Sequence, residues 1–95
     1  MELKTAQALM LQLYEKQDKK HGAEGTFIWL VEEIGELSEA LRKKDKENIS
    51  EEIADVLAWL LSLGNVMGID VSDSFKEKYD SICPSCHKKP CNCNK

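Results

Sequence analysis

Two acidic segments of the chain have residue types and spacing that suit metal binding. Residues 31–41 read VEEIGELSEAL, and residues 50–60 read SEEIADVLAWL. Each segment opens with a glutamate pair and carries another carboxylate three residues after the second glutamate of that pair. Carboxylate oxygens are the ligands that Mg²⁺ or Mn²⁺ prefers. The candidate ligands are therefore Glu33, Glu36, Glu52 and Asp55.

Helical geometry places these carboxylates on matching sides of two helices. An α-helix turns about 100° per residue. With Ile34 taken as the centre of the apolar stripe of its helix, Glu33 and Glu36 lie roughly 100° and 160° to one side. The same construction around Ile53 puts the two carboxylates of the second segment at the same angles on the same side. Both helices therefore carry their acids on the same shoulder of the stripe.

This duplicated geometry leaves two interpretations open, a metal site or ordinary surface charge. Two helices that pack antiparallel through their stripes, as a short connection favours, would bring the four carboxylates together. Close like charges repel unless a cation neutralises them. Each acidic shoulder also carries one indole, from Trp29 or Trp59, and neither acidic window contains Lys or Arg. The alternative is that the glutamates are solvated helix surface, which is common for Glu-Glu pairs.

Hydrophobic periodicity predicts an all-α chain of four helices and a tail. The expected helices cover about residues 3–20, 27–43, 48–67 and 70–81. Gly22 and Gly25 separate the first two helices, and Thr26 is the expected N-cap of the second. Apolar residues at helical spacing mark the stripes: Leu3, Ala6, Met10, Leu13 and Tyr14 in the first helix, Phe27, Leu30, Ile34, Leu37 and Leu41 in the second, and Ile49, Ile53, Val56, Leu57, Leu60 and Met67 in the third.

Capping residues define the ends of the later helices. Asn48 with Glu51 three residues on resembles a capping box for the third helix. Gly68 suits the C-cap of that helix. Asp70 or Ser72 is the expected cap of the fourth helix.

The C-terminal tail carries a second candidate metal site. Residues 83–93 read CPSCHKKPCNC, which holds all four cysteines of the chain. Four thiolates suit tetrahedral Zn²⁺, and the C-x₂-C half is a turn that presents two sulfurs to one ion. The sequence therefore predicts a zinc clip formed by Cys83, Cys86, Cys91 and Cys93, with His87 as a spare ligand. The alternative is a disordered tail whose thiols stay reduced.

Length and charge limit the classes of function. Ninety-five residues make one domain at most, and a chain this short buries a limited share of its surface, so an oligomer is expected. The net charge of −4 does not favour nucleic acid as a partner. The sequence shows no signal peptide and no apolar run of the roughly 18 residues that a membrane span needs. The expected location is the cytoplasm.

The acidic motifs resemble a known family pattern. Glu32-Glu33-Ile-Gly-Glu36, then residues 37–51, then Glu52-Ile-Ala-Asp55 is similar to the E-E-x-x-E … E-x-x-D signature of the MazG-type nucleotide pyrophosphohydrolases. These enzymes belong to the all-α NTP pyrophosphatase superfamily. The resemblance covers about residues 8–80 and extends to the flanking words FIWLVEEIGELSEAL and EEIADVLAWLLSLGNVMGID. It implies a MazG-like four-helix bundle, assembled as a homodimer or homotetramer, over residues 1–81, with residues 82–95 as an appended Cys-rich tail.

The resemblance also implies a reaction and assigns roles. It implies Mg²⁺-dependent hydrolysis of nucleoside triphosphates to the monophosphate and pyrophosphate, in nucleotide-pool house-cleaning. Glu32 matches the leading glutamate of the motif, for an additional metal or for positioning water. Lys76, Lys78 and Trp29 are candidate substrate contacts, although the Arg that family members often carry on the last helix is missing here. The metal ligands that it implies are Glu33, Glu36, Glu52 and Asp55.

Two other functions compete with this one. The chain could be a non-catalytic helical oligomer whose Cys tail binds zinc or a partner. All four ligand positions of the acidic motif are filled, which favours the enzyme. A zinc-dependent nucleic-acid adaptor is disfavoured by the acidic balance, although Lys88 and Lys89 lie in the tail.

Overall fold

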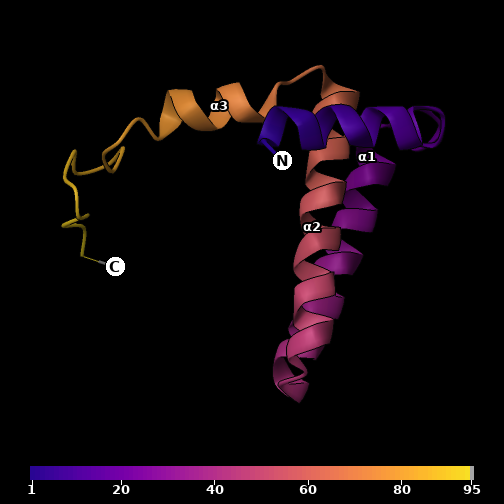
Figure 1. Cartoon of the computed structure of the whole chain (residues 1–95), viewed down its shortest axis with the longest axis horizontal. Coiled ribbons are helices and arrows are strands. Elements are labelled where there is room, and N and C mark those ends of the chain that lie inside the picture. The colour runs from indigo at the N-terminus through magenta and orange to yellow at the C-terminus, as the bar shows by residue number, and fades with distance from the viewer. Residues whose placement is uncertain (95) are drawn as a thin grey trace.

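Three α-helices make up the regular part of the computed structural model, which describes residues 1–94. They are α1 (Leu3–Lys43), α2 (Lys46–Met67) and α3 (Val71–Lys78), and residues 1–94 contain no strand. The second half of α1 runs antiparallel beside α2, the first half of α1 lies across the end of α2, and α3 leads away toward the tail (Figure 1). The all-α class predicted from the sequence is confirmed.

Gly22 divides α1 into two straight halves. Its backbone has φ 71° and ψ −177°, a conformation that residues with a side chain rarely adopt, and it alone is non-helical within α1. The predicted break is therefore correct at Gly22 and wrong at Gly25, which is helical. Thr26 is not an N-cap either, because helix resumes directly after Gly22 and Thr26 lies fully buried inside it.

The connection between α1 and α2 is only two residues long. Lys44 adopts a left-handed conformation that ends α1, and Asp45 is the N-cap of α2. The Asn48 backbone N–H donates to Oδ1 of Asp45 at 3.3 Å. The capping box predicted at Asn48 is therefore wrong, because Asp45 supplies the cap earlier in the chain. A connection this short leaves an antiparallel arrangement as the simple solution.

The predictions for the end of α2 and the start of α3 agree with the structure. Gly68 is the C-cap of α2 with φ 67°, and Asp70 is the N-cap of α3, whose carboxylate accepts from the Asp73 backbone N–H at 3.0 Å. α3 ends at Lys78 rather than near Ser81.

Gln7 ties the first half of α1 to the turn between α2 and α3. Its side-chain amide donates to the Ile69 carbonyl at 2.8 Å and accepts from the Val71 backbone N–H at 2.9 Å. The side chain of Asn65 donates to the Gln7 carbonyl at 3.1 Å. A Cβ at Gly64 would meet the Gln7 amide nitrogen at 2.9 Å, so a glycine is needed where the two helices approach. These contacts set how the first half of α1 crosses α2.

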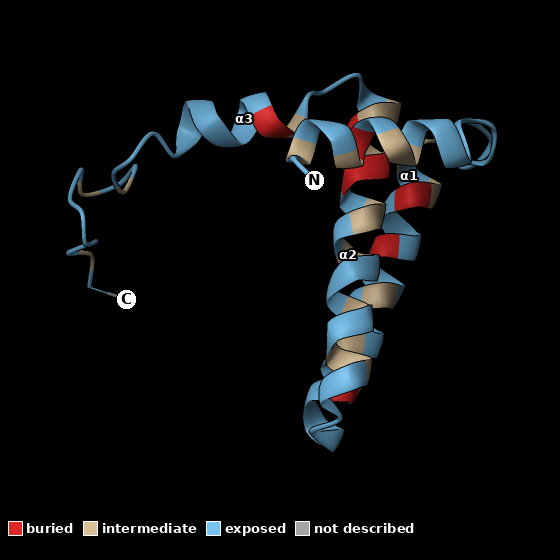
Figure 2. Cartoon of the chain, viewed as in Figure 1, coloured by how far each residue is buried: buried red, intermediate tan, exposed pale blue. Residues whose placement is uncertain are grey.

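The chain by itself buries little apolar surface. Among residues 1–94 the buried apolar side chains are Leu30, Ala40 and Leu61, and Figure 2 shows buried positions as scattered patches along α1 and α2 and at the start of α3. Ile34 and Ile53, taken from the sequence as centres of packed stripes, are 49% and 55% exposed. α1 and α2 therefore do not pack through the centres of these stripes, although Leu30, at the edge of the first stripe, is buried. The single chain is an open arrangement of three helices, the first of them bent at Gly22, and the four-helix bundle assembled from several copies stays a prediction.

The helices also bear on membrane insertion. Within residues 1–94, no single helix is both long enough and apolar enough to cross a bilayer. Taken together, α2 and α3 reach that length and apolar content, but the two helices are bent by 99° relative to each other.

We expect Gln7→Ala to lower the free energy of unfolding by about 1–3 kcal/mol, because it leaves a half-buried carbonyl and N–H without partners. Urea unfolding followed by circular dichroism measures this change. Gln12→Ala, at an exposed position on the same half of α1, is the matched control and should be close to neutral. Equal stability of the two variants would contradict the assigned role of Gln7.

Candidate functional site

Three carboxyl groups from α1 and α2 meet where the two helices run side by side. Glu33 and Glu36 come from the second half of α1 and Glu52 comes from α2, and each offers one oxygen within 4.8 Å of the others. Glu33 and Glu52 are half-buried, while Glu36 is exposed. The helices pair through the shoulder that carries these acids. The convergence predicted from the sequence is therefore present for three residues, although the apolar stripes point elsewhere.

The acids form a strained electrostatic environment. The pKa of Glu33 is raised from 4.5 to about 7, most strongly by burial and in addition by the nearby carboxyl groups of Glu36 and Glu52 and the charge of Asp55. Oxygen Oε2 of Glu33 and Oε2 of Glu52 are buried, and neither has a hydrogen-bond partner within residues 1–94. A cation close to these unpaired oxygens would relieve the repulsion between the carboxylates.

The donor set fits a hard divalent cation. Buried polar atoms normally have partners, and a cation shared by several carboxylates would satisfy both the unpaired oxygens and the like-charge repulsion. Oxygen-only ligands select Mg²⁺ or Mn²⁺ over softer metals. The residues present therefore fit the ion that the sequence led us to expect.

The remaining predicted acids occupy two different positions. Asp55 lies outside the set of three whose oxygens approach within 4.8 Å, yet its charge acts on Glu33. Glu32 is exposed and does not join the set. Its predicted role in catalysis stays a prediction.

Two tryptophans stack next to the acids. The rings of Trp29 on α1 and Trp59 on α2 have centroids 5.8 Å apart and are inclined by only 9°. The His21 ring lies 6.4 Å from each of them. The paired indoles noticed in the sequence are thus a direct contact between the two helices.

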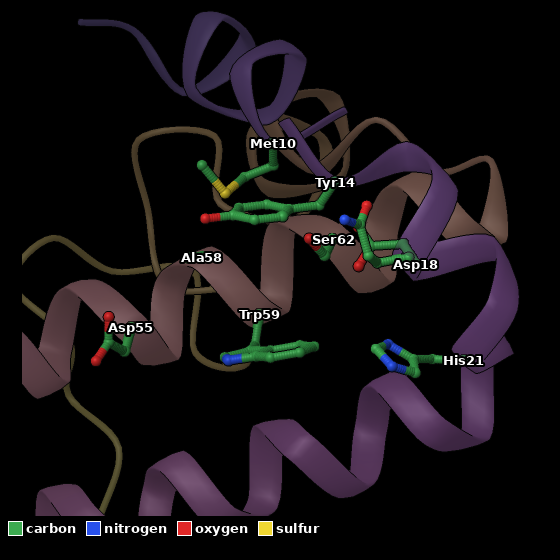
Figure 3. Close-up of a pocket in the computed structure, with 9 residues that line it drawn as sticks. Met10, Tyr14, Asp18, His21, Asp55, Ala58, Trp59 and Ser62 are labelled. Carbon is green, nitrogen blue, oxygen red and sulfur yellow. The ribbon is translucent and has the colours of Figure 1, made fainter. Parts of the chain in front are cut away.

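A cavity of about 340 Å³ adjoins this stack. Met10 and Tyr14, from the first half of α1, lie on one side and Trp59 on the other, with Asp55 at one end and His21 at the opposite end (Figure 3). Trp29 does not line the cavity but supports Trp59 from behind. The cavity therefore exists only because Gly22 turns the first half of α1 across α2.

Several residues of this cavity were not singled out from the sequence. The sequence predicts Met10 and Tyr14 as members of the apolar stripe of the first helix, and a lone histidine at position 21, in the expected loop, indicates little by itself. Asp18 is 5% exposed, and its Oδ2 has no hydrogen-bond partner among the described residues. The one available signal was the break at Gly22, which indicates that the chain changes direction there but not toward which helix. Lys76 and Lys78 are exposed on α3 and do not line the cavity, so their contact with substrate stays a prediction.

The family comparison agrees with this site. The model of the MazG nucleotide pyrophosphohydrolase domain matches residues 21–87, which is more than half of the chain and includes every acid of the site. The chain belongs to the MazG family. No curated protein shows a significant match to it. The resemblance drawn from the acidic motifs is thereby confirmed.

The cysteines of this MazG domain form a separate cluster. One sulfur from each of Cys83, Cys86, Cys91 and Cys93 lies within 4.8 Å of the others. The family match ends at residue 87, so it includes the first two cysteines and not the last two. The complete cluster therefore extends beyond the matched domain. Figure 1 shows the tail on the far side of α3, away from the paired helices.

The raised pKa of Glu33 makes a prediction for the metal-free MazG domain. Between about pH 4.5 and 7 the folded protein holds a proton on Glu33 that the unfolded chain has lost. The contribution of this group to stability therefore falls as pH rises through that window and is constant above it. We expect Glu33→Gln to remove this fall, so that the variant gains stability relative to wild type as pH rises.

Thermal melting in the presence of a chelator, at a series of pH values from 4.5 to 8, measures this difference. Glu77→Gln, at an exposed position on α3, is the control and should follow wild type throughout. A constant difference between wild type and Glu33→Gln over the whole range would contradict the prediction.

Proposed function

We propose that the chain is an Mg²⁺-dependent nucleoside triphosphate pyrophosphohydrolase. It would hydrolyse an NTP or dNTP with one water to the nucleoside monophosphate and pyrophosphate, and so act in nucleotide-pool house-cleaning in the cytoplasm. Membership of the MazG family supports the reaction class. The ion and the triphosphate substrate are the finer part of the proposal.

The observation that carries this proposal is that Asp55 belongs both to the cavity and to the surroundings of the acidic group. It lines the cavity, and its charge also acts on Glu33 in the acidic group. A ligand seated in the cavity would therefore have one end beside the acids. A nucleotide has this polarity, since it joins an apolar base to a charged phosphate chain that needs cations near it.

The acids would act through a bound ion. Mg²⁺ held there would neutralise charge on the phosphate oxygens and lower the pKa of an attacking water. Glu33, Glu36 and Glu52 would hold the ion, with Asp55 completing the set toward the cavity. Because Glu33 and Glu52 are half-buried, their side chains are restrained and present their oxygens in a fixed direction.

The cavity would hold the nucleoside. The indole of Trp59 offers a flat apolar face for a base, and its stack with Trp29 fixes the orientation of that face. Tyr14 on the opposite side and the buried carboxylate of Asp18 give the cavity polar groups for hydrogen bonds with the base or sugar. Trp29 would then serve substrate binding indirectly, by holding Trp59.

We also propose that the chain works as a homodimer or a dimer of such dimers. The stripes around Ile34 and Ile53 are about half exposed, and a groove of about 540 Å³ between Phe27, Leu60 and Met67 is lined almost entirely by apolar side chains. A second copy would cover these surfaces and complete the four-helix core that the single chain lacks. Apolar patches of this extent on a small chain favour self-association.

Isosteric changes in the acids separate this enzyme from a helical protein with solvated surface charge. We expect Glu36→Gln and Asp55→Asn each to lower activity by at least ~10²-fold, about 2.7 kcal/mol of transition-state stabilisation. Removing one of several repelling charges should leave the metal-free stability unchanged or raise it by ~0.5–2 kcal/mol. Mg²⁺ should stabilise wild type against heat, and should stabilise the variants less.

Pyrophosphate release from a panel of nucleotides, paired with thermal melting with and without Mg²⁺, measures these effects. Glu51→Gln is the matched control, because Glu51 is exposed beside Glu52 and lies outside the group of three. It should keep wild-type activity. Full activity in Glu36→Gln or Asp55→Asn, or a wild type with no turnover and no Mg²⁺ effect on melting, would overturn the proposed function.

We expect light scattering to give the mass of a dimer or tetramer at micromolar protein, because association buries the exposed stripes. Ile53→Lys should weaken association, since it places a charge in the apolar interface. Glu51→Lys, roughly 160° away around α2, is the control for an added lysine and should leave the mass unchanged. A wild-type monomer would refute the proposed assembly.

A further inference from the structure

The four cysteine sulfurs of the tail lie as close to one another as the four ligands of one metal ion do. Sγ of Cys83 lies 3.7 Å from Sγ of Cys93, and Sγ of Cys86 lies 3.8 Å from Sγ of Cys91. Four sulfurs at the ~2.3 Å Zn–S bond length around a tetrahedral ion are separated by roughly 3.8 Å. All four cysteines are free, and these separations are far longer than a disulfide bond of ~2.0 Å.

The backbone folds so that the first pair of sulfurs faces one point. The His87 N–H donates to the Cys83 carbonyl at 2.8 Å, and the Cys83 N–H donates to the Lys88 carbonyl at 3.0 Å. His87 takes a left-handed conformation with φ 61°, which closes this tight turn. The local structure thus presents the sulfurs of Cys83 and Cys86 side by side.

Backbone amides point at the sulfurs as they do around metal-bound thiolates. The Asn92 N–H donates to Sγ of Cys86 at 3.2 Å, and the Cys93 N–H donates to Sγ of Cys91 at 3.3 Å. Donors of this kind stabilise the thiolate, which is the form that binds metal.

No apolar core holds the tail in this shape. Among residues 79–94 no side chain is buried, and no helix follows α3. A loop that buries so little surface cannot offset the entropy of ordering its backbone. Metal binding supplies that free energy in small domains of this type.

The ligand set also limits the choice of metal. Four thiolates in a tetrahedron suit Zn²⁺ and do not suit Mg²⁺. An iron–sulfur cluster divides its cysteines among several iron atoms and so separates them more widely, whereas all four sulfurs here lie within 4.8 Å of one another. A site with four protein ligands has no open position, as in structural rather than catalytic zinc sites.

We propose that Cys83, Cys86, Cys91 and Cys93 bind one structural Zn²⁺ that folds residues 83–93 into a compact knob at the end of α3. The site is independent of the acidic group and of the proposed hydrolysis. Because it has no contact with the paired helices, its loss should unfold the knob and leave α1 and α2 intact.

Metal analysis of the reduced full-length protein, after gel filtration in zinc-containing buffer, tests the stoichiometry. We expect about one zinc per chain in wild type and almost none in Cys86→Ser or Cys93→Ser. His87→Gly is the matched control: it removes the nearby imidazole at a position whose φ suits glycine, and it should keep the zinc. The far-ultraviolet circular dichroism of the cysteine variants should remain helical, which separates loss of the site from loss of the fold.

Replacement of zinc by Co²⁺ tests the geometry. Tetrahedral tetrathiolate coordination gives intense visible absorption and a thiolate-to-cobalt band in the near ultraviolet, and we expect both in wild type and in His87→Gly. Wild type without metal, bound iron in place of zinc, zinc retained in both cysteine variants, or zinc lost from His87→Gly would each overturn the proposed four-cysteine zinc site.

Discussion

The pairing of two helices through an acidic face is the constraint on which the rest of this molecule depends. Glu33 and Glu52 occupy positions between α1 and α2 that a stable helix pair would normally fill with apolar side chains. Their charges repel when no cation is present, which the raised pKa of Glu33 expresses directly. The contact between α1 and α2 is therefore less stable than an apolar contact would be, and in return it concentrates negative charge where water is partly excluded.

Other features compensate for that arrangement. The two-residue connection of Lys44 and Asp45 holds the ends of the helices together, and the stacked indoles of Trp29 and Trp59 supply a large apolar contact beside the acids. Gln7 fixes the opposite end. Because the acids lie on the side of each helix that faces the other helix, the centres of the apolar stripes face outward. The same packing therefore favours a cation between the helices and a second copy of the chain on the outer surface.

Much of this arrangement could be predicted from the sequence, because it depends on local rules. The left-handed turn at Gly22, the cap at Asp70 and the end of α2 at Gly68 follow from the conformational preferences of single residues. The grouping of Glu33, Glu36 and Glu52 follows from helical periodicity combined with a short connection. Besides several helix ends and caps, the face used for pairing was mistaken, since periodicity shows that Ile34 and Ile53 are apolar but not whether the chain itself or another copy covers them.

The cavity could not be predicted from the sequence, because it depends on the angle between the two halves of α1. The crossing of the first half over α2 brings Tyr14, Asp18 and His21 to Trp59, and no local pattern contains that angle. It is set by the dihedral angles of Gly22 at one end and by the contacts of Gln7 at the other. Side chains that appear as ordinary stripe or surface residues in the sequence thereby become walls of a cavity.

The tryptophan stack has a spectroscopic consequence. Trp29 and Trp59 are the only two tryptophans of the chain, and they lie against each other at 5.8 Å with nearly parallel rings. Indoles this close couple their electronic transitions, so the near-ultraviolet circular dichroism of the protein arises largely from one contact between α1 and α2. The tryptophan fluorescence likewise originates at this contact, beside the cavity. The chain thus carries its own optical reporter, with no label required, and what it reports is the state of the helix interface that holds the acids.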